Sequence, residues 1–417
     1  MTPARSVPAP HATGAIPGAG AAPVVLRAGA ATVIAAEPAE ILAADGAEAL
    51  AALDRLDRGW WAGFVSFDLG HAIERITPAR THHREVPDLL LARYDARLVL
   101  DGGEASVEGD GPARARLEHV LEQAVGPGAP VPLGAATTSL GREAHGSRVR
   151  SIIDLLEAGD CYQVNLTRRL EWSRGADPIA LFNALGRANP APHAALLVLP
   201  RADGDPVAVV SASPERFLAW HDDGDGRVVE TRPIKGTGRD ADALRASAKN
   251  RAENVMIVDL ARNDLGRVCE YGTIEVPELC AVEAHPGLFH LVSTVRGRLR
   301  HDVGLGGLIG ATFPPASVTG APKPRVLQAI EDLEPVRRGV YCGAIGWIDA
   351  DRGTGDLAVA IRTFTIADGR TSLGVGGGIV ADSVPADEWR ETELKASRLL
   401  EAAGAQDVGG SEPYPHA

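Results

Sequence analysis

The order of strand-like and helix-like segments between residues 147 and 403 limits the possible folds more than any other feature. Segments rich in β-branched and aromatic residues, such as 161–172, 207–220 and 227–234, follow one another across short turns. A parallel sheet would require one helix between each pair of strands, whereas grouped strands indicate antiparallel pairing. We therefore predict an α+β protein whose mainly antiparallel sheets are covered by helices.

Composition divides the chain into two tails and two blocks. Residues 1–22 and 404–417 are rich in Pro, Ala and Gly, which predicts disordered tails. The blocks between them span 23–145 and 146–403. Residues 101–146 read as a polar linker with a short helix. The pattern at 147–159 predicts an amphipathic helix ended by Gly159, and further helices are expected at 242–261 and 385–401.

Charge and cysteine usage exclude several classes of protein. A formal net charge of −13 argues against a nucleic-acid surface, but it allows a locally positive pocket for a small anion. Cys161, Cys269, Cys280 and Cys342 form no C-x-x-C pair, which indicates reduced thiols rather than a disulfide framework or a zinc site. No apolar run is long enough to span a membrane, and the N-terminus lacks a signal-peptide h-region. We expect a cytoplasmic protein without membrane or nucleic-acid partners.

Two predicted helices carry carboxylates in positions that allow two interpretations. Glu253 shares a helix face with apolar residues, and a carboxylate that points inward needs a cation or several donors. Glu388, Glu391 and Lys395 share a face of the last helix. Inward carboxylates from two helices suit Mg²⁺, which binds a few protein oxygens and keeps waters for a substrate. Glu391 and Lys395 also fit an ordinary surface ion pair.

Two further segments could bind an anion. Gly376, Gly377 and Gly378 follow the strand that contains Arg362, so the glycine backbone could form an anion nest and the guanidinium could clamp a carboxylate. The alternative is a twisted strand with bulges. Thr319 lies just before a predicted helix, where an anion can bind, although simple capping is the commoner arrangement.

Long motifs, in a fixed order, resemble those of the chorismate-utilising enzymes. They include GDCYQVNLTRR, SPERF, TRPIKGT, RAENVMIVDLARNDLGRV, FHLVSTV, TFPPASVTGAPK, GVYCGAIGW, AIRTFT, GGGIVADS and EWRETELK. The resemblance covers nearly all of the second block and, more weakly, the first. It implies a single chorismate-binding domain over residues 23–403, with two antiparallel sheets packed together, helices outside, and a cleft that binds chorismate and Mg²⁺.

The resemblance also implies roles for individual residues. The implied metal ligands are Glu253, Glu388 and Glu391. The implied substrate-binding residues are Gln163, Tyr341, Arg362, Gly376, Gly377, Gly378 and Lys395. The implied catalytic residues are Lys235, Glu215, His290 and Thr319. Glu215 matches the acid that protonates the departing C4 hydroxyl of chorismate, whereas Thr319 and His290 match polar residues around the ring.

Lys235 in TRPIKGT separates the branches of this family. Anthranilate-, salicylate- and isochorismate-forming relatives carry a non-basic residue there, and the 4-amino-4-deoxychorismate-forming branch carries lysine. If a lysine amine first occupies C2 of chorismate, ammonia must enter at C4, which is covalent catalysis. The alternative without a catalytic role is a surface lysine that extends from a turn. The rival functions are anthranilate formation and a non-catalytic homologue.

The ammonia for such a reaction needs a separate source. The cysteines lie in DCYQ, VCEY, LCAV and YCGA, and none forms a glutaminase nucleophile elbow. The resemblance therefore implies a separate glutamine amidotransferase subunit as partner, and a product that serves p-aminobenzoate and folate biosynthesis.

Overall fold

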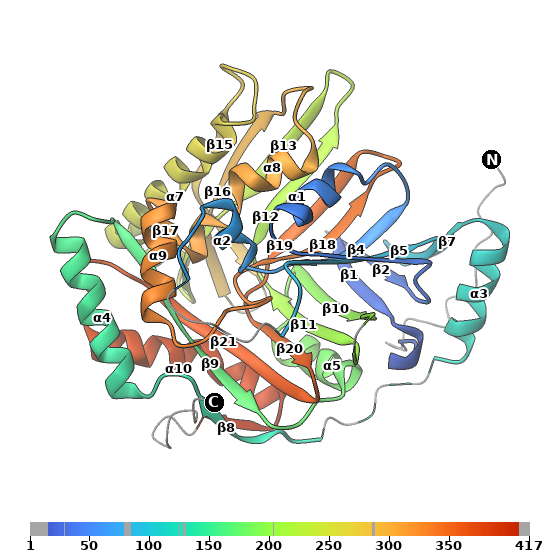
Figure 1. The fold of residues 1–417 in the computed structure, drawn as a ribbon, viewed down its shortest axis with the longest axis horizontal. Helices are drawn as coiled ribbons and strands as arrows, with labels where there is room; N and C mark the ends of the chain where they lie inside the picture. The colour runs from blue at the N-terminus through green and yellow to red at the C-terminus, as the bar shows by residue number, and fades with distance from the viewer. Residues whose placement is uncertain are drawn as a thin grey trace.

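The computed structural model describes residues 16–28, 30–78, 85–124, 126, 128, 131–202, 204–285 and 288–407. Its two sheets are almost entirely antiparallel, and helices lie outside them, which confirms the predicted α+β class (Figure 1). Residues 1–15 and 408–417 of the predicted tails lie outside the described residues. The pieces 16–22 and 404–407 belong to the fold, because Ile16 packs in a core cluster and Ala405–Asp407 forms a strand. In the described residues, no helix is long and apolar enough to cross a membrane.

The first sheet contains twelve strands in the described part of the chain. Their spatial order is β22-β8-β9-β21-β20-β11-β10-β1-β2-β6-β7, with β17 beside β9, and only β22 and β8 pair in parallel. The strands are β1 Val24–Ala28, β2 Ala31–Ala35, β6 Ala96–Asp101, β7 Glu104–Gly109, β8 Gly134–Thr138, β9 Gln163–Trp172, β10 His193–Leu199, β11 Val207–Ser213, β17 Gly320–Ala321, β20 Thr363–Ala367, β21 Arg370–Ile379 and β22 Ala405–Asp407.

The second sheet contains ten strands among the described residues. Their order is β14-β16-β13-β12-β19-β18-β4-β5-β3, with β15 also paired to β16. The strands are β3 Glu40–Ala44, β4 Trp60–Val65, β5 Leu89–Tyr94, β12 Arg216–Asp222, β13 Arg227–Arg232, β14 Ile234–Gly238, β15 Glu275–His285, β16 Leu288–Arg298, β18 Ala344–Asp349 and β19 Thr354–Val359.

Ten α-helices surround the sheets in the described part of the chain. They are α1 Gly46–Asp54, α2 Leu69–Ile73, α3 Gly111–Glu122, α4 Arg142–Glu157, α5 Pro178–Ala188, α6 Ala241–Ala246, α7 Ala248–Gly266, α8 Leu305–Thr312, α9 Lys323–Leu333 and α10 Pro385–Ala402, with short 3-10 turns η1 Ala19–Ala21 and η2 Ala316–Val318. Gly159 follows α4 with a φ of +79°, as expected for the end of a helix.

Two predictions about local structure need correction. The helix expected at 242–261 is two helices, because Ser247 adopts an extended conformation and its hydroxyl caps the backbone N–H of Asn250 at the start of α7. The predicted linker at 101–146 contains β7, α3 and β8. The apolar face of α3, with Leu117 and Leu121, is buried, so this segment is part of the packed domain.

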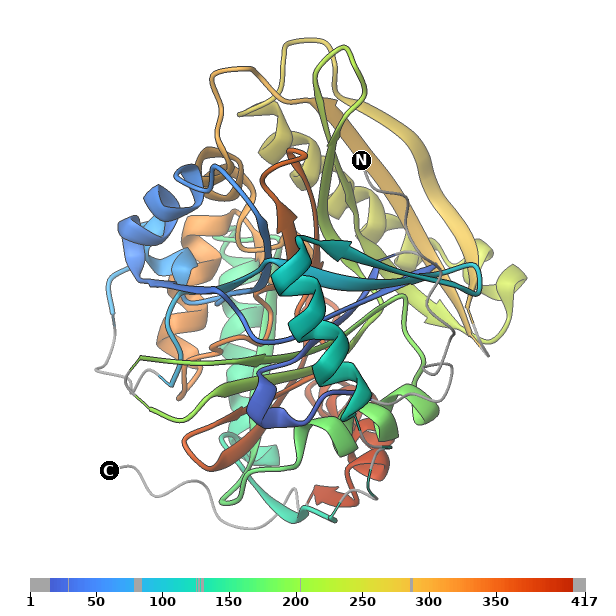
Figure 2. The same ribbon diagram turned by 90° about the vertical axis from the view of Figure 1, so that its right-hand side faces the viewer.

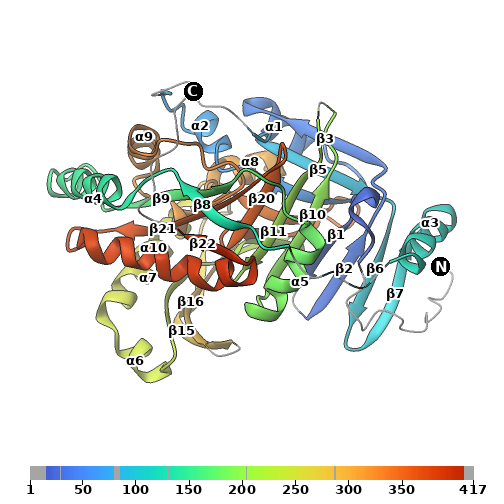
Figure 3. The same cartoon turned by 90° about the horizontal axis from the view of Figure 1, so that it is seen from below.

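Three apolar layers hold the domain together. Residues such as Leu26, Phe64 and Leu197 fill the space between the two sheets. Helices α3, α5 and α10 cover the outer face of the first sheet, and α9 packs on its strands β9 and β17. Helices α1 and α7 pack on the second sheet, and α8 packs against both of them. Figure 2 shows the two sheets from the side, and Figure 3 shows α10 beside α4, below β9 and β21. This arrangement brings β14, α7 and α10 near the glycine-rich end of β21.

Candidate active site

Lys235 lies inside a strand and points toward the interior. The prediction placed it after the strand 227–234, but the structure has a second strand, β14, over 234–238. A register irregularity against β16 falls between Ile234 and Thr237, and such a bulge redirects side chains. Gly236 has a φ of +90°, and a Cβ there would lie 2.9 Å from Cγ of Asn250, so this turn in the strand requires glycine.

The amine of Lys235 has a defined hydrogen-bond partner. Its Nζ donates to the main-chain oxygen of Ser317, 3.2 Å away. Burial lowers the pKa of Lys235 from its ordinary value of 10.5, and the carboxylate of Glu253 is the largest opposing influence. A lysine in a surface turn would have neither feature. The surface interpretation of Lys235 is therefore wrong.

Glu215 is a buried acid in the link between β11 and β12. Its backbone N–H donates to the hydroxyl of Ser213, and its main-chain oxygen accepts the N–H of Val359. Burial raises the pKa of its carboxyl to about 7, while a hydrogen bond from Ser317 and the charge of Lys235 act to lower it. A carboxyl with this pKa retains a proton near neutral pH, so Glu215 can act as a general acid.

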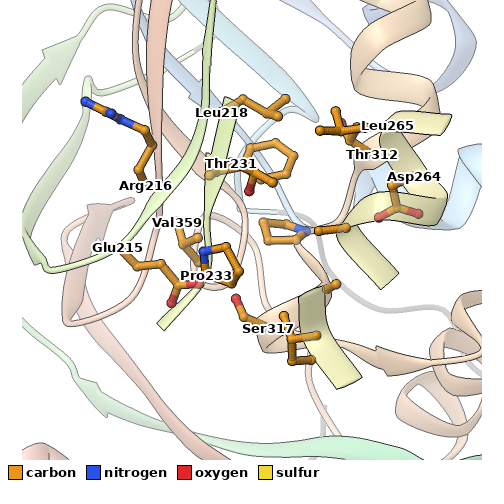
Figure 4. A pocket seen from close by; sticks show the side chains of 15 residues that line it. Glu215, Arg216, Leu218, Thr231, Pro233, Asp264, Leu265, Thr312, Ser317 and Val359 are labelled. Carbon is orange, nitrogen blue, oxygen red and sulfur yellow. The ribbon is translucent and has the colours of Figure 1, made fainter. Parts of the chain in front are cut away.

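A cavity adjoins Glu215 (Figure 4). The carboxyl of Glu215 and the hydroxyl of Ser317 point toward one another at one end, and Asp264 and Thr312 lie at the other. Much of the remaining lining is apolar and includes Phe217, Leu218, Pro233, Ile257, Leu265 and Val359. Apolar walls disfavour an ionised carboxyl, which explains the raised pKa of Glu215.

His290 and Thr319 occupy polar positions with restricted hydrogen bonding. Nδ1 of His290 lies 2.8 Å from the hydroxyl of Thr237. Burial, followed by the charges of His285 and Arg362, lowers the pKa of His290 to about 4, so its imidazole is neutral at pH 7. The hydroxyl of Thr319 donates to the main-chain oxygen of Pro315 at 2.9 Å. It can therefore offer a ligand only its acceptor lone pairs while this bond persists.

Gln163 presents a buried amide beside the glycine segment of β21. Its side chain has no exposed surface, yet neither its amide nitrogen nor its amide oxygen has a hydrogen-bond partner among the described residues. A buried amide without hydrogen bonds lowers the stability of the folded state. Such a group therefore indicates a functional role, such as binding a ligand. A Cβ on Gly378 would lie 2.8 Å from Nε2 of Gln163. The glycine therefore leaves space beside this amide.

The glycine-rich segment forms a strand and not an anion nest. Gly376, Gly377 and Gly378 pair without interruption with Thr167, Leu166 and Asn165 of β9. The nest interpretation was wrong, and the predicted bulges are absent from this ladder. The β20–β21 ladder ends at Leu373, so β20 leaves one edge of the glycine segment unpaired. That edge offers main-chain groups to a ligand.

Arg362 is a partly buried cation without a counter-ion in the described part of the chain. It precedes β20 with a φ of +52°, and no hydrogen bond or ion pair joins its guanidinium to another described residue. Burial and the nearby charge of Arg398 act against its charged form and lower its pKa. An arginine held in this way suits an incoming carboxylate.

Tyr341 lines another cavity, together with Thr167, Arg338 and Gly374. A Cβ on Gly374 would lie 2.1 Å from Cδ1 of the tyrosine ring, so the ring covers this part of β21. Burial raises the pKa of Tyr341 well above its ordinary value, which keeps the phenol neutral. The structure does not place Tyr341 in the cavity that contains Glu215.

Glu388 and Glu391 meet at the other face of β21. A Cβ on Gly377 would lie 3.2 Å from Glu391 Oε1 and 3.4 Å from Glu388 Oε2. Burial raises the pKa of Glu388, with a further increase from the charge of Glu391. Burial also acts to raise the pKa of Glu391, but the ammonium of Lys395, 2.6 Å away, outweighs it, and the pKa is lowered.

The third predicted ligand, Glu253, lies on α7 and faces the charge of Lys235. Among the described residues, no three acidic, histidine or cysteine side chains converge closely enough to form a metal centre by themselves. Glu388 and Glu391 therefore form a pair of carboxylates on α10, and Glu253 lies separately on α7. The three-ligand magnesium site stays a prediction.

Two serines were missed by sequence reasoning. Ser317 contacts both Lys235 and Glu215, and the hydroxyl of Ser383 donates to Glu388 at 2.7 Å. Both lie in segments that the motifs include, SVTGAPK and ADSV. A serine in a loop has no periodicity or spacing that separates a site residue from a turn residue, so the sequence held no usable signal.

The chain is similar in sequence to proteins of one known family. Residues 13–401 match the sequence profile of a family described as chorismate binding enzyme. The chain is 41% identical over 351 residues to aminodeoxychorismate synthase component 1 of Klebsiella aerogenes, which covers 81% of this chain and 76% of that protein. It is 37% identical over 373 residues to anthranilate synthase component 1 of Thermus thermophilus, and the match covers 84% of this chain and 79% of that protein.

A solved structure gives the same result for the fold. The crystal structure of anthranilate synthase component I from Streptococcus pneumoniae superposes with a TM-score of 0.74 and 27% identity, over 88% of this chain and 92% of that one. Relatives with two different names resemble this chain, so the side chains of the site must decide between their activities.

Proposed function

The chain belongs to the family of chorismate binding enzymes, and on this premise we propose that it is component 1 of an aminodeoxychorismate synthase. The proposed reaction converts chorismate and ammonia to 4-amino-4-deoxychorismate and water. Anthranilate formation is the alternative, because an anthranilate synthase component is also among the similar proteins.

The position of Lys235 favours 4-amino-4-deoxychorismate formation over anthranilate formation. Its amine is directed to the Ser317 oxygen, and the charges that act on it include those of Glu253, Glu215 and Glu391. Burial favours the uncharged amine, which is the nucleophilic form. An enzyme that only binds ammonia at this place would have no use for a buried primary amine, which is costly to desolvate.

In the first proposed step, the lone pair of Lys235 forms a bond to C2 of chorismate. The ring double bonds shift, and the bond between C4 and its hydroxyl oxygen breaks. Glu215 gives its proton to the departing oxygen, which leaves as water. Its pKa of about 7 supports this role, because the carboxyl is substantially protonated near neutral pH. The substituted lysine nitrogen then loses one proton.

In the second step, ammonia forms a bond to C4 and the double bonds shift back. The bond between C2 and the lysine nitrogen breaks, and the lysine leaves as an amine after accepting one proton. The new C4 ammonium loses the balancing proton. Two allylic substitutions thereby replace one direct exchange at C4. Nitrogen from ammonia cannot reach C2 while Lys235 occupies it.

The remaining site residues bind and orient the substrate in this proposal. Arg362, which has no counter-ion among the described residues, would pair with one carboxylate of chorismate. The amide of Gln163 and the unpaired edge of β21 would supply hydrogen bonds to polar groups of the same ligand. His290 is neutral and can donate or accept a hydrogen bond beside the ring.

Magnesium remains part of the proposal. Glu388 and Glu391 converge on Gly377, and their mutual repulsion is the kind that a divalent cation relieves. Mg²⁺ bound there, with Glu253, would offset the negative charge of the substrate carboxylate. A separate glutamine amidotransferase subunit would supply the ammonia.

Product analysis tests the proposed function. The chain is incubated with chorismate, Mg²⁺ and an ammonium salt without any partner protein, and the products are separated chromatographically. A 4-amino product supports the proposal. An ortho-amino product would assign the chain to the anthranilate branch. Unchanged chorismate, also after addition of a glutamine amidotransferase, would indicate a non-catalytic homologue.

A further inference from the structure

Ser317 touches both reactive groups of the proposed mechanism. It is the middle residue of η2, 82 positions from Lys235 in the sequence, and only 8% of its surface is exposed. Its main-chain oxygen accepts a hydrogen bond from the side-chain amine of Lys235. Its hydroxyl faces the carboxyl of Glu215 (Figure 4). No other described residue is hydrogen-bonded to both of these side chains. The two contacts use different parts of one residue.

The main-chain contact restricts where the amine can point. A neutral primary amine has two N–H bonds and one lone pair. When one N–H is donated to a fixed carbonyl oxygen, the lone pair must point away from that oxygen. Because the nucleophile reacts through its lone pair, the Ser317 carbonyl limits the directions from which Lys235 can attack.

The hydroxyl contact serves the acid in both of its protonation states. A serine hydroxyl donates to a carboxylate and accepts from a protonated carboxyl. The other groups that act on Glu215 are the charge of Lys235 and the backbone N–H of Ile234. The Ser317 hydroxyl opposes the effect of burial and lowers the pKa of Glu215, so it favours the form that remains after proton donation.

The segment that carries Ser317 is firmly held. The next residue, Val318, accepts a hydrogen bond from the buried guanidinium of Arg338 at 2.9 Å, and Arg338 pairs with Glu334 at 2.6 Å. The hydroxyl of Thr319 donates to Pro315 on the other side of the turn. A rigid support is what a residue needs in order to orient two others.

We propose that Ser317 is a positioning residue that fixes the acid Glu215 and the nucleophile Lys235 relative to one another. This rests on the proposed function, because it assumes that both side chains react. The hydroxyl would control the timing of proton donation, and the carbonyl would control the direction of attack. Only the hydroxyl can be removed by substitution.

The test compares Ser317→Ala with wild type. The substitution keeps the carbonyl and removes the hydroxyl. We expect kcat to fall about tenfold to hundredfold, as for a lost hydrogen bond to a charged group, with KM for chorismate changed less than about twofold. The loss of activity at high pH should move to higher pH, since Glu215 then keeps its proton longer. Free ammonia is held constant across the pH series.

Two variants separate positioning from packing. Ser317→Thr retains the hydroxyl and should restore most of kcat and the wild-type pH profile. Ser139→Ala is the matched control, because Ser139 is also 8% exposed and hydrogen-bonded, but its partner is the backbone N–H of Arg169. It should lose stability without a change in the pH profile. If Ser317→Ala does not fold, Ser317→Cys keeps the volume, weakens the hydrogen bond and should show the same shift.

The outcomes distinguish this inference from the proposed function. A Ser317→Ala enzyme with wild-type kcat and pH profile overturns the positioning role. So does a lower kcat with an unmoved profile that threonine fails to restore. If Lys235→Ala retains the wild-type rate in the same assay, the proposed function itself fails, whatever Ser317 does.

Discussion

Nζ of Lys395 lies 2.6 Å from a carboxylate oxygen of Glu391 and 2.9 Å from the main-chain oxygen of Gly376. One side chain therefore joins the carboxylate of a predicted magnesium ligand to the glycine strand. The pair is half exposed, and in water an ion pair of this kind contributes little stability. Its two contacts instead hold Lys395 between the Glu391 carboxylate on α10 and the main chain of β21.

Glu391→Gln should weaken Mg²⁺ binding by at least about tenfold, because a neutral amide is a poor replacement for a carboxylate ligand of a hard cation. Titration calorimetry with Mg²⁺ measures the affinity. Glu393→Gln is the control, since Glu393 lies on the same helix and binds the indole N–H of Trp389. Equal Mg²⁺ affinity in both variants would remove Glu391 from the metal site.

Lys235→Ala should lower the rate of 4-amino product formation by on the order of a thousandfold or more, because the covalent route is lost. The chain has four lysines, Lys235, Lys249, Lys323 and Lys395, so peptide mapping by mass spectrometry can locate an adduct with chorismate. We expect it on Lys235 alone. Arg262→Ala is the control, because Arg262 is exposed on α7 and pairs with Asp259, and it should keep its rate within about twofold.

A chorismate adduct on a different lysine would contradict this assignment. So would a Lys235→Ala enzyme that forms the 4-amino product at the wild-type rate. Unlike the product analysis, this experiment tests the route and not only the identity of the product.

Arg362→Lys should raise KM for chorismate at least about tenfold, because a point charge cannot make the two parallel hydrogen bonds of a guanidinium. Steady-state kinetics at saturating ammonia give KM and kcat separately. Arg390→Lys on α10 is the control, since Arg390 is exposed and, among the described residues, pairs only with Asp387 and the backbone of its own helix. An unchanged KM in Arg362→Lys would show that this guanidinium does not bind the substrate.

Glu215→Gln should stabilise the protein at high pH. The folded-state pKa of Glu215 is about 7, above its ordinary value of 4.5, so the native state binds this proton more tightly than the unfolded chain does. The contribution of this proton to the free energy of unfolding is fully present below about pH 4.5. It declines by roughly 3 kcal/mol as the pH rises toward 7. The glutamine variant has no such titration.

Urea unfolding at pH 5 and pH 8 measures this difference. The advantage of Glu215→Gln over wild type should grow by up to roughly 3 kcal/mol between the two pH values. The same advantage at both would mean that Glu215 is not buried as a protonated acid.

The sequence by itself determined the fold class and most of the elements. Grouped strands predicted antiparallel sheets, and apolar periodicity predicted α4 and α10 within a few residues. These features depend on local patterns, which a chain carries in its own order of residues. Local patterns also explain the errors, since one serine at position 247 divides a helix that periodicity alone would continue.

Only the tertiary structure decided how the site is assembled. Ser317 meets Lys235 across 82 residues because a short 3-10 turn packs against a bulged strand of the second sheet. The burial that raises the pKa of Glu215 comes from apolar walls on several elements, and burial in the packed domain also lowers the pKa of Lys235. The order of residues predicts which groups are present. Proximity and desolvation, which decide their chemistry, exist only after distant segments have packed together.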